Sequence, residues 1–508
     1  MRSIARGIAT FTAAVLAVGP ALATWSIVVV DLDTGEVCVA TATCLTGTDI
    51  QKVVPIIVVG RGAGAAQSII DSGAVARNVM WTGFEAGDSP DQILTDVLAA
   101  VNFDNNRQYG IVALQADPPA TYTGSNCAAA AGGLSGSAGS MLYSIQGNIL
   151  TGSVVWKAAK HALLTTPGDL GQRVMAAMEA ARSMGGDGRC SCSVTAPTSC
   201  GAPPASFTKS AHTACIVLAR VGDADGNCNG SAGCANGPYY LSMTVKGNWN
   251  DSDPVIELQG LYDTWRQGLL GRPDHILSVA ETTAMSLPAD GLATTEARLW
   301  LFDVDGVPLT TGGATLSFAH PDGLPGSLTP GAVTDHGDGS YSFDVTAGNQ
   351  EGVAKLAITA DDGTVQALLY PYLELRLDAP APLHAGQDAV SAADGASVPF
   401  TIDLGASSAM SSYLLVGSAS GTSPGLPWSG LTVPLNWDDV MWTTLTYPGP
   451  PLLPGSFGVL DAVGRATASL EATPGLLDPL IGLHLDWALI ALGTAPVVTN
   501  AVGFDILP

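Results

Sequence analysis

Basic residues are scarce in this chain. Its 508 residues include 20 lysines and arginines against 45 aspartates and glutamates, which gives a formal net charge of −25. No lysine follows Lys355, and Arg465 is the only arginine after Arg376. A surface this acidic repels nucleic acid and anionic lipid. We therefore expect no nucleic-acid partner, and we interpret the charge as an aid to solubility outside the cell.

Long apolar runs are also lacking, because no stretch of 18 or more apolar residues follows the N-terminal segment. No transmembrane segment is therefore expected in the mature protein. In the N-terminal segment, two arginines precede an apolar stretch at residues 8–18, and Ala21-Leu22-Ala23 has the small-x-small pattern that signal peptidase recognises. We expect a signal peptide over residues 1–23, a secreted or cell-surface location, and a mature chain that begins with Thr24.

Cysteine is missing from the second half of the chain. Export makes disulfides the expected fate of the nine cysteines in the first half. An odd number leaves one thiol unpaired or paired between chains, and the sequence does not give the pairing. The nine are Cys38, Cys44, Cys127, Cys190, Cys192, Cys200, Cys215, Cys228 and Cys234.

Two cysteine-rich segments suggest metal sites at first sight. The four cysteines between residues 190 and 215 could bind zinc, but their Cys-x-Cys start lacks the usual gap of two or more residues. The Asp-rich segment 223–230 is similar to a calcium loop, but Cys228 and Cys234 hold the places of its glycine and its terminal glutamate. A disulfide that closes this turn is the simpler interpretation, so we expect no metal and no cofactor.

Thr24 could be a catalyst as well as the first mature residue. A hydroxyl is a poor nucleophile near neutral pH, but the free α-amine of an N-terminal threonine can accept its proton. That amine has a pKa of about 7.7–8.0. The alternative is that some residue must follow any signal peptide, and threonine needs no special role there.

Strand and helix patterns alternate between Thr24 and about Gly271. The pattern predicts a layered α+β domain over residues 24–271, in which helices are grouped between runs of antiparallel strands. The expected strands lie near residues 25–30, 37–43, 53–59, 60–67, 109–114, 140–146, 214–221 and 239–245, and the expected helices begin near residues 90, 153, 169 and 254.

After His275 helical periodicity disappears and short alternating strands with Gly, Pro and Asp turns follow. This pattern of short strands and turns is typical of β-sandwiches. We expect one all-β sandwich domain over residues 277–376 and a second β-rich module over 377–508. The tryptophans of the last module could stack on sugars, although burial in a sandwich core is more common. They are Trp428, Trp437, Trp442 and Trp487.

The N-terminal domain resembles the family called domain of unknown function 1028. The resemblance rests on Thr24-Trp25-Ser26-Ile27-Val28, on the Gln-Gly-Asn segment within residues 143–150, on the Gly-Gly-Asp turn within 178–189 and on the closing helix at 253–258. The family is placed by similarity in the N-terminal-nucleophile hydrolase superfamily. The resemblance therefore implies an αββα layered sandwich whose first strand presents Thr24 as the nucleophile.

The second domain is similar to bacterial immunoglobulin-like domains of the invasin or filamin type. Residues 297–306 and 333–342 carry this resemblance. The last module is weakly similar, through residues 459–467 and 499–501, to a C-terminal module of various secreted bacterial proteins.

Several polar residues are candidates to assist Thr24. The oxyanion of a tetrahedral intermediate needs hydrogen-bond donors, and Asn148 is the first candidate, with Gln146 and Gln67 behind it. The alternative is that Gly-Asn is merely a turn signal. Asp187 could orient the α-amine, although an aspartate after a helix end is usually a solvated turn residue. Lys52 could lower a nearby pKa, but a lysine at a strand edge more commonly extends into water.

Two hypotheses follow. The leading one is a secreted N-terminal-threonine amidohydrolase that acts on a small amide or peptide, and the resemblance allows a substrate derived from the cell wall. His161, in a helix among alanine and lysine, does not support a Ser-His-Asp arrangement, and no Gly-x-Ser-x-Gly elbow is present. The rival is a non-catalytic surface or adhesion protein that binds glycans or proteins through its β-sandwich modules.

Overall fold

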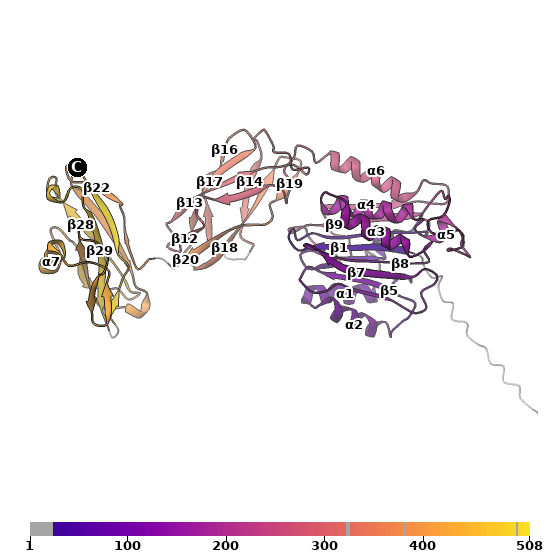
Figure 1. The fold of residues 1–508 in the computed structure, drawn as a ribbon, viewed down its shortest axis with the longest axis horizontal. Coiled ribbons are helices and arrows are strands. Elements are labelled where there is room, and N and C mark those ends of the chain that lie inside the picture. The colour runs from indigo at the N-terminus through magenta and orange to yellow at the C-terminus, as the bar shows by residue number, and fades with distance from the viewer. Residues whose placement is uncertain (1–23, 322–325, 380, 494–495) are drawn as a thin grey trace, which may run out of the picture.

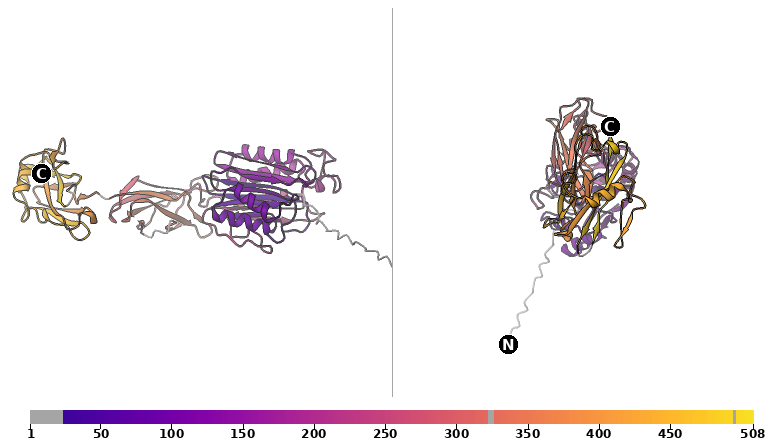
Figure 2. Two further views of the ribbon diagram at one scale, coloured as in Figure 1. Left: turned by 90° about the horizontal axis from the view of Figure 1, so that it is seen from below. Right: turned by 90° about the vertical axis from the view of Figure 1, so that its left-hand side faces the viewer.

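The computed structural model describes residues 24–321, 326–379, 381–493 and 496–508. The predicted signal peptide lies outside the described residues. Three bodies follow one another along the chain, an α+β body and then two β-rich bodies (Figure 1). Figure 2 shows the same row from two further sides. Over the described ranges, no helix is both long enough and apolar enough to cross a membrane.

A six-stranded antiparallel sheet forms the centre of the first body. Its strand order is β10-β9-β2-β1-β8-β7, so β1 lies inside the sheet with a neighbour on each side. Almost every residue of β1 is buried, which suits its β-branched run of valines. The strands are β1 (Thr24–Asp31), β2 (Val37–Thr43), β7 (Gly132–Ala138), β8 (Met141–Asn148), β9 (Thr213–Ala219) and β10 (Leu241–Lys246).

A second sheet packs face to face on the first. Val28 and Val39 of the first sheet share a buried cluster with Ile57 and Val112 of the second. The second sheet has the order β3-β4-β5-β6. Its strands are β3 (Pro55–Val58), β4 (Gly62–Gln67), β5 (Gln108–Ala113) and β6 (Ala120–Thr123).

Helices cover the outer face of each sheet (Figure 1). α3 (Val154–Thr165), α4 (Leu170–Ser183) and α6 (Pro254–Gln267) pack on the six-stranded sheet. α1 (Val75–Ala86) and α2 (Pro90–Ala100) pack on the other. The short elements η1 (Ile50–Lys52) and α5 (Gly188–Ser191) complete the body. The predicted α+β class is confirmed.

Side-chain caps set the starts of three of the four helices that the sequence predicted, α2, α4 and α6. Asp169 accepts a hydrogen bond from the Gln172 backbone, and the Gln172 side chain accepts one from the Asp169 backbone, which is a complete capping box. Ser89 caps α2 and Asp253 caps α6, each followed by a proline.

The second body consists of two packed sheets. One has the order β11-β13-β17-β15 with β16 beside β17, and the other has the order β12-β20-β18-β14 with β19 beside β18. Leu299, Phe343, Leu356 and Leu375 lie in the core between them. The strands are β11 (Val279–Thr282), β12 (Ser286–Pro288), β13 (Thr294–Trp300), β14 (Thr315–Ala319), β15 (Leu328–Pro330), β16 (Thr334–Asp335), β17 (Ser340–Ala347), β18 (Gly352–Asp361), β19 (Gln366–Leu368) and β20 (Leu373–Asp378).

The third body is also β-rich, with sheets β21-β23-β28 and β22-β31-β29-β24-β27, β30 beside β29, and a hairpin β25-β26. Trp487 is 2% exposed and packs against Phe400 and Phe504 in its core. The elements are β21 (Leu383–Ala385), β22 (Ala389–Ser391), β23 (Ala396–Asp403), η2 (Ala406–Ser408), β24 (Ser412–Ser418), β25 (Leu426–Trp428), β26 (Leu431–Val433), α7 (Asp439–Thr446), β27 (Phe457–Val459), β28 (Arg465–Ala472), η3 (Asp478–Leu480), β29 (His484–Leu492), β30 (Val497–Val498) and β31 (Val502–Leu507).

α7 corrects the prediction that helices end at His275. Asp438 caps it by accepting a hydrogen bond from the Met441 backbone, and Met441 packs in a buried cluster with Val416 of β24. Three of its eight residues are threonines. Threonine weakens a helix signal because its β-branched side chain loses freedom there.

Three disulfides form in the described part of the chain, as the sequence predicted. They join Cys44 to Cys190, Cys192 to Cys200, and Cys228 to Cys234. The zinc alternative is wrong, because Cys190, Cys192 and Cys200 are oxidised. Three thiols stay free, where the sequence led us to expect one: Cys38, Cys127 and Cys215.

Candidate functional site

Thr24 is the first residue of β1 and stands in a row of polar side chains across the six-stranded sheet. Its direct cross-strand partners are Thr43 in β2 and Asn148 in β8, and Thr43 in turn pairs with Thr213 in β9. Directly opposed residues of antiparallel strands point to the same face. The hydrogen bonds of Thr24, Ser26 and Asn148 to residues of the second sheet or of the loop after it place this row between the two sheets.

Two contacts orient Thr24. Its Oγ1 donates to Oγ1 of Thr43 at 3.3 Å. Its backbone carbonyl accepts a hydrogen bond from Nε2 of Gln67 at 3.0 Å. Thr24 is only 1% exposed in the full chain. The hydroxyl is therefore fixed in direction and shielded from bulk water.

Gln67 connects the two sheets. It ends β4, and its Oε1 accepts a hydrogen bond from Oγ of Ser26 at 2.5 Å. Its amide nitrogen also donates to Oε1 of Gln108 at 2.7 Å, and Gln108 donates to the carbonyl of Gly147 at 2.9 Å. Sequence reasoning selected Gln67 but missed Gln108, because only the pairing of β4 with β5 brings them together.

Asn148 lies where the sequence placed the oxyanion candidate, at the end of β8 and opposite Thr24. It is fully buried, and its Nδ2 donates to Oγ of Ser68 at 3.0 Å. It is the last residue of the paired strand β8, and the chain turns directly after it.

Two residues beside this site have a left-handed backbone. Ser68, directly after Gln67, has a φ of 76°, and Ile149, directly after Asn148, has a φ of 52°. Residues other than glycine rarely adopt this conformation, and it carries a cost that functional sites often store. The chain thus turns sharply right after each of two candidate residues.

Gln146 lies two residues before Asn148 in β8, and its cross-strand partner is Ser26 rather than Thr24. Its Oε1 accepts a hydrogen bond from Ser144 at 2.9 Å, and its Nε2 has no acceptor among the described residues. A Cβ at Gly110 would stand 2.4 Å from that Oε1, so only glycine leaves room for the amide. The structure makes Gln146 a packing neighbour of the site, without direct contact to Thr24.

Asp187 is fully buried, which contradicts the interpretation as a solvated turn residue. Its carboxylate accepts hydrogen bonds from the backbone of Cys44 and from the guanidinium of Arg189, each at 2.8 Å. Burial raises the pKa of Asp187, and Arg189 opposes this rise. Asp187 thus fixes the backbone of Cys44, the residue after Thr43, and has no described contact with Thr24.

His212 belongs to the same end of the sheet, and the sequence gave no signal for it beyond its nearness to the cysteines. Its backbone nitrogen donates to the carbonyl of Thr43 at 2.8 Å. Its ring lies within 4.8 Å of the sulfurs of Cys44 and Cys190 and makes an edge contact with Trp249, whose ring centre is 4.4 Å away. Because both sulfurs are in a disulfide, no thiolate is available there to bind a metal.

Two lesser candidates lie away from Thr24. Lys52 is half exposed and faces Asp49, its Nζ being 3.9 Å from the carboxylate, which agrees with the solvated alternative. His161 is exposed on α3.

The space beside Thr24 is small. A cavity of about 10 Å³ is lined by Thr24, Gln67, Ser68 and neighbouring apolar residues, and this is room for about one water molecule. In the full chain Ala23 precedes Thr24, so the α-amine that would activate the hydroxyl does not yet exist.

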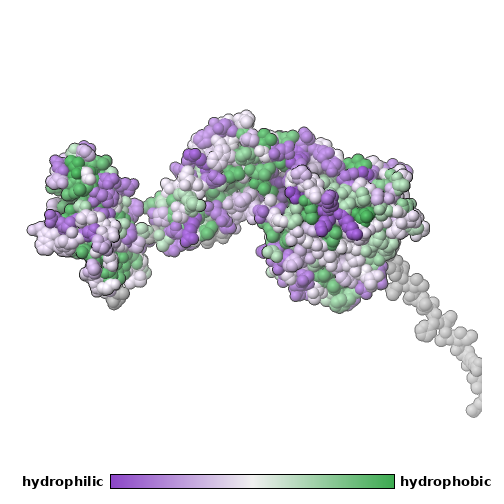
Figure 3. Space-filling view, viewed as in Figure 1, coloured by the Kyte–Doolittle hydropathy of each residue, from purple (hydrophilic) through white to green (hydrophobic). Residues whose placement is uncertain are grey.

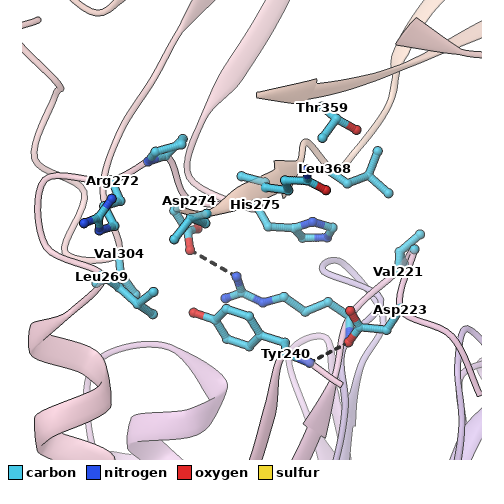
Figure 4. Close-up of a pocket in the computed structure, with 16 residues that line it drawn as sticks. Val221, Asp223, Tyr240, Leu269, Arg272, Asp274, His275, Val304, Thr359 and Leu368 are labelled. Carbon is cyan, nitrogen blue, oxygen red and sulfur yellow. Dashed lines mark hydrogen bonds and ion pairs between the residues drawn. The ribbon is translucent and has the colours of Figure 1, made fainter. Parts of the chain in front are cut away.

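Larger cavities lie where the first body meets the second. One cavity of about 290 Å³ is lined by residues that include His275 and Tyr240 (Figure 4). Arg220 lies over the ring of Tyr240 at 3.5 Å and forms ion pairs with Glu36 at 2.8 Å and with Asp274 at 3.1 Å. All three charged groups are buried at the joint between the bodies.

Family comparisons agree with both resemblances expected from the sequence. The α+β body matches the family of unknown function DUF1028 over residues 24–196. The second, immunoglobulin-like body matches domain 3 of invasin over residues 275–368. No match was found among curated proteins.

A DUF1028 protein and bacterial adhesins are among the solved structures that are similar to this chain. A DUF1028 protein of Silicibacter pomeroyi is 18% identical, with 48% of this chain and 88% of that chain covered and a TM-score of 0.34. The adhesin InvE of Yersinia pseudotuberculosis is 20% identical, with 45% and 58% covered and a TM-score of 0.20. The Escherichia coli adhesin FdeC is 11% identical, with 95% and 97% covered and a TM-score of 0.21.

Proposed function

We propose that this protein is an exported N-terminal-threonine hydrolase of amide bonds, with Thr24 as its nucleophile. The observation that carries the proposal is the position of Thr24. It begins an interior strand of the sheet, and its hydroxyl lies in the polar row between the sheets, opposite Asn148. The helix-sheet-sheet-helix layering around it supports membership of the N-terminal-nucleophile superfamily.

Cleavage after Ala23 is the activating step in this proposal. It releases the α-amine of Thr24, which then accepts the proton of the threonine hydroxyl as Oγ1 attacks the substrate carbonyl. The cleavage also removes Ala23, which is bonded to the backbone nitrogen of Thr24 in the precursor. Thr43, 3.3 Å from Oγ1, keeps the hydroxyl oriented.

The tetrahedral intermediate then needs hydrogen-bond donors for its oxyanion. The amide of Asn148 and nearby backbone N–H groups are suited to this, provided that Asn148 exchanges its bond to Ser68 for one to the substrate. The α-ammonium returns its proton to the leaving nitrogen as the C–N bond breaks. Water then hydrolyses the ester on Thr24 and regenerates the hydroxyl.

The substrate class we favour is a small amide or peptide of the cell surface or cell wall. The acidic surface and the disulfides suit an extracellular location.

The test compares Thr24→Ser and Thr24→Ala in exported protein treated with an electrophile that acylates N-terminal hydroxyls. The serine variant keeps a hydroxyl and an α-amine, so it should label and hydrolyse more slowly than the parent, whereas the alanine variant should do neither. Equal labelling of the alanine variant would exclude Thr24 as the nucleophile.

A second candidate is a non-catalytic surface or adhesion protein. The match of the second body to invasin domain 3 favours it, as does the small cavity beside Thr24. Binding to a cell surface or matrix that is unchanged in Thr24→Ala, without any labelling in the parent, would support this candidate over the hydrolase.

A further inference from the structure

The third body exposes two tryptophans side by side. Trp437 and Trp442 are 56% and 57% exposed, and their ring centres are 6.2 Å apart with planes inclined by 57°. Trp487 of the same body is 2% exposed and lies in the core. Large aromatic side chains are mostly buried, so this exposed pair, which we call the aromatic pair, requires an explanation.

The backbone around the aromatic pair is held firmly. Asn436 bonds to the backbone of the 420–425 loop, with its Nδ2 2.8 Å from the carbonyls of Ser420 and Ser423. Asp438 accepts hydrogen bonds from the backbones of Ala419 and Met441. Trp437 therefore stands between two anchored residues, and the platform is ordered before any ligand arrives.

α7 presents polar groups beside the rings. Its outer face carries four exposed residues, Asp439, Trp442, Thr443 and Thr446, and both Trp442 and Thr443 lie three or four residues from Asp439 and from Thr446. The hydroxyls of Thr443 and Thr446 each donate to a backbone carbonyl one turn earlier at 2.7 Å. Their oxygens remain able to accept hydrogen bonds from a ligand.

The charge of this body excludes anionic ligands. Between residues 377 and 508 the sequence has eleven acidic residues, no lysine and one arginine, Arg465. Phosphate, sulfate and carboxylate groups are recognised mainly by arginine and lysine. An uncharged ligand is not repelled by the acidic residues of this body, and it carries no ionic group that would lack a partner there.

The size of the aromatic pair argues against a protein partner. Two partly exposed aromatic side chains offer at most about 300 Å², whereas a stable protein interface takes about 800 Å² from each partner. In Figure 3 the hydrophobic residues of this body form separate groups among hydrophilic ones on the visible face. α7 lies at the outer end of the molecule (Figures 1 and 2), where a long polymer can reach it.

We infer that Trp437 and Trp442 form a binding site for an uncharged polysaccharide. The apolar C–H faces of the sugar rings stack on the two indoles, and sugar hydroxyls donate to Asp439, Thr443 and Thr446. The site lies in a different body from Thr24, so the inference stands or falls independently of the hydrolase proposal.

The test is native gel electrophoresis of the full-length protein in gels that contain hydroxyethyl cellulose, glycol chitin or polygalacturonate. At least one of the two uncharged polymers should retard the protein, while the anionic polygalacturonate should not. Trp437→Ala and Trp442→Ala should each weaken retardation by about tenfold or more, and the double variant should abolish it. Trp442→Tyr, which keeps an aromatic face, should retain part of it.

Trp249→Ala is the matched control, because Trp249 is 62% exposed in the first body. It should be retarded like the parent. Absence of retardation by both uncharged polymers, or equal retardation of the double variant, would overturn the inference. So would a dimer of the parent that the double variant cannot form, because the pair would then serve a protein contact.

Discussion

At the scale of single residues, the polar row around Thr24 could be predicted only in part. Thr24, Gln67 and Asn148 could be selected because each has a suitable side chain in a recognisable sequence context. Thr43 and Gln108 could not, because their roles depend on strand register. For Asp187, the sequence does not reveal that the side chain is buried or that it pairs with Arg189.

His212 should make the first body sensitive to acid. Burial, helped by Lys209 and Arg189, lowers the pKa of His212 to about 4, whereas an unfolded histidine has a pKa of about 6.5. Between these values the unfolded chain binds a proton that the native protein does not. The stabilisation is therefore complete above about pH 6.5 and is lost as the pH falls towards 4.

Chemical denaturation at pH 7 and pH 4.5 checks this expectation. The parent should lose about 2 kcal/mol more than His212→Gln on acidification, because carboxylates that also titrate contribute equally to both proteins. Equal losses would show that His212 is protonated in the native state.

At the scale of elements, side-chain caps helped to predict some helices, but α3 was predicted without one and α7 was missed in spite of its Asp438 cap. α2, α4 and α6 begin with Ser or Asp caps, two of them before a proline. α1 was missed because it follows Ala74 in a left-handed conformation, with no side-chain cap. β7 was missed because its sequence, GGLSGSA, is mostly glycine and serine, and these residues give no strand signal.

The disulfide between Cys44 and Cys190 should contribute more than the one between Cys192 and Cys200. The first closes a separation of 146 residues and fixes the end of β2 to α5, while the second spans 8 residues. Loop entropy in the unfolded chain gives about 5 kcal/mol for the first and about 2.5 kcal/mol for the second.

Paired serine substitutions provide the measurement. Replacing Cys44 and Cys190 should lower the midpoint of denaturation of the first body more than replacing Cys192 and Cys200. Similar shifts in both variants would mean that the long connection is already restrained in the unfolded chain.

At the scale of the whole molecule, composition predicted three successive units, but not how they touch. Arg266 of α6 forms ion pairs with Asp169 in the first body and with Asp305 in the second, 2.7 Å away. Arg272 adds a pair with Asp362 at 2.8 Å. These contacts join residues about 40 to 100 positions apart in the sequence, and no local sequence pattern predicts them.

Removing Arg266 should loosen the joint without unfolding either body. Arg266→Ala leaves Asp169 and Asp305 without this partner, so small-angle X-ray scattering should show a broader distribution of distances between the first two bodies. Arg298→Ala is the control, because Arg298 pairs with Glu296 on one exposed strand of the second body. Identical scattering from both variants would indicate that the buried Arg220 cluster and the Arg272–Asp362 pair hold the joint without Arg266.

Thr24 connects the export of the whole molecule with its proposed catalysis, because the predicted cleavage exposes Thr24 and the proposed reaction uses its hydroxyl. The most direct measurement is the mass of the N-terminal peptide of exported protein, before and after reaction with a β-lactone electrophile. We predict an N-terminal peptide that begins at residue 24 and gains one acyl group, both in the parent and in Thr24→Ser. A chain that starts elsewhere, or a Thr24 peptide that stays unmodified under these conditions, would contradict the proposed mechanism.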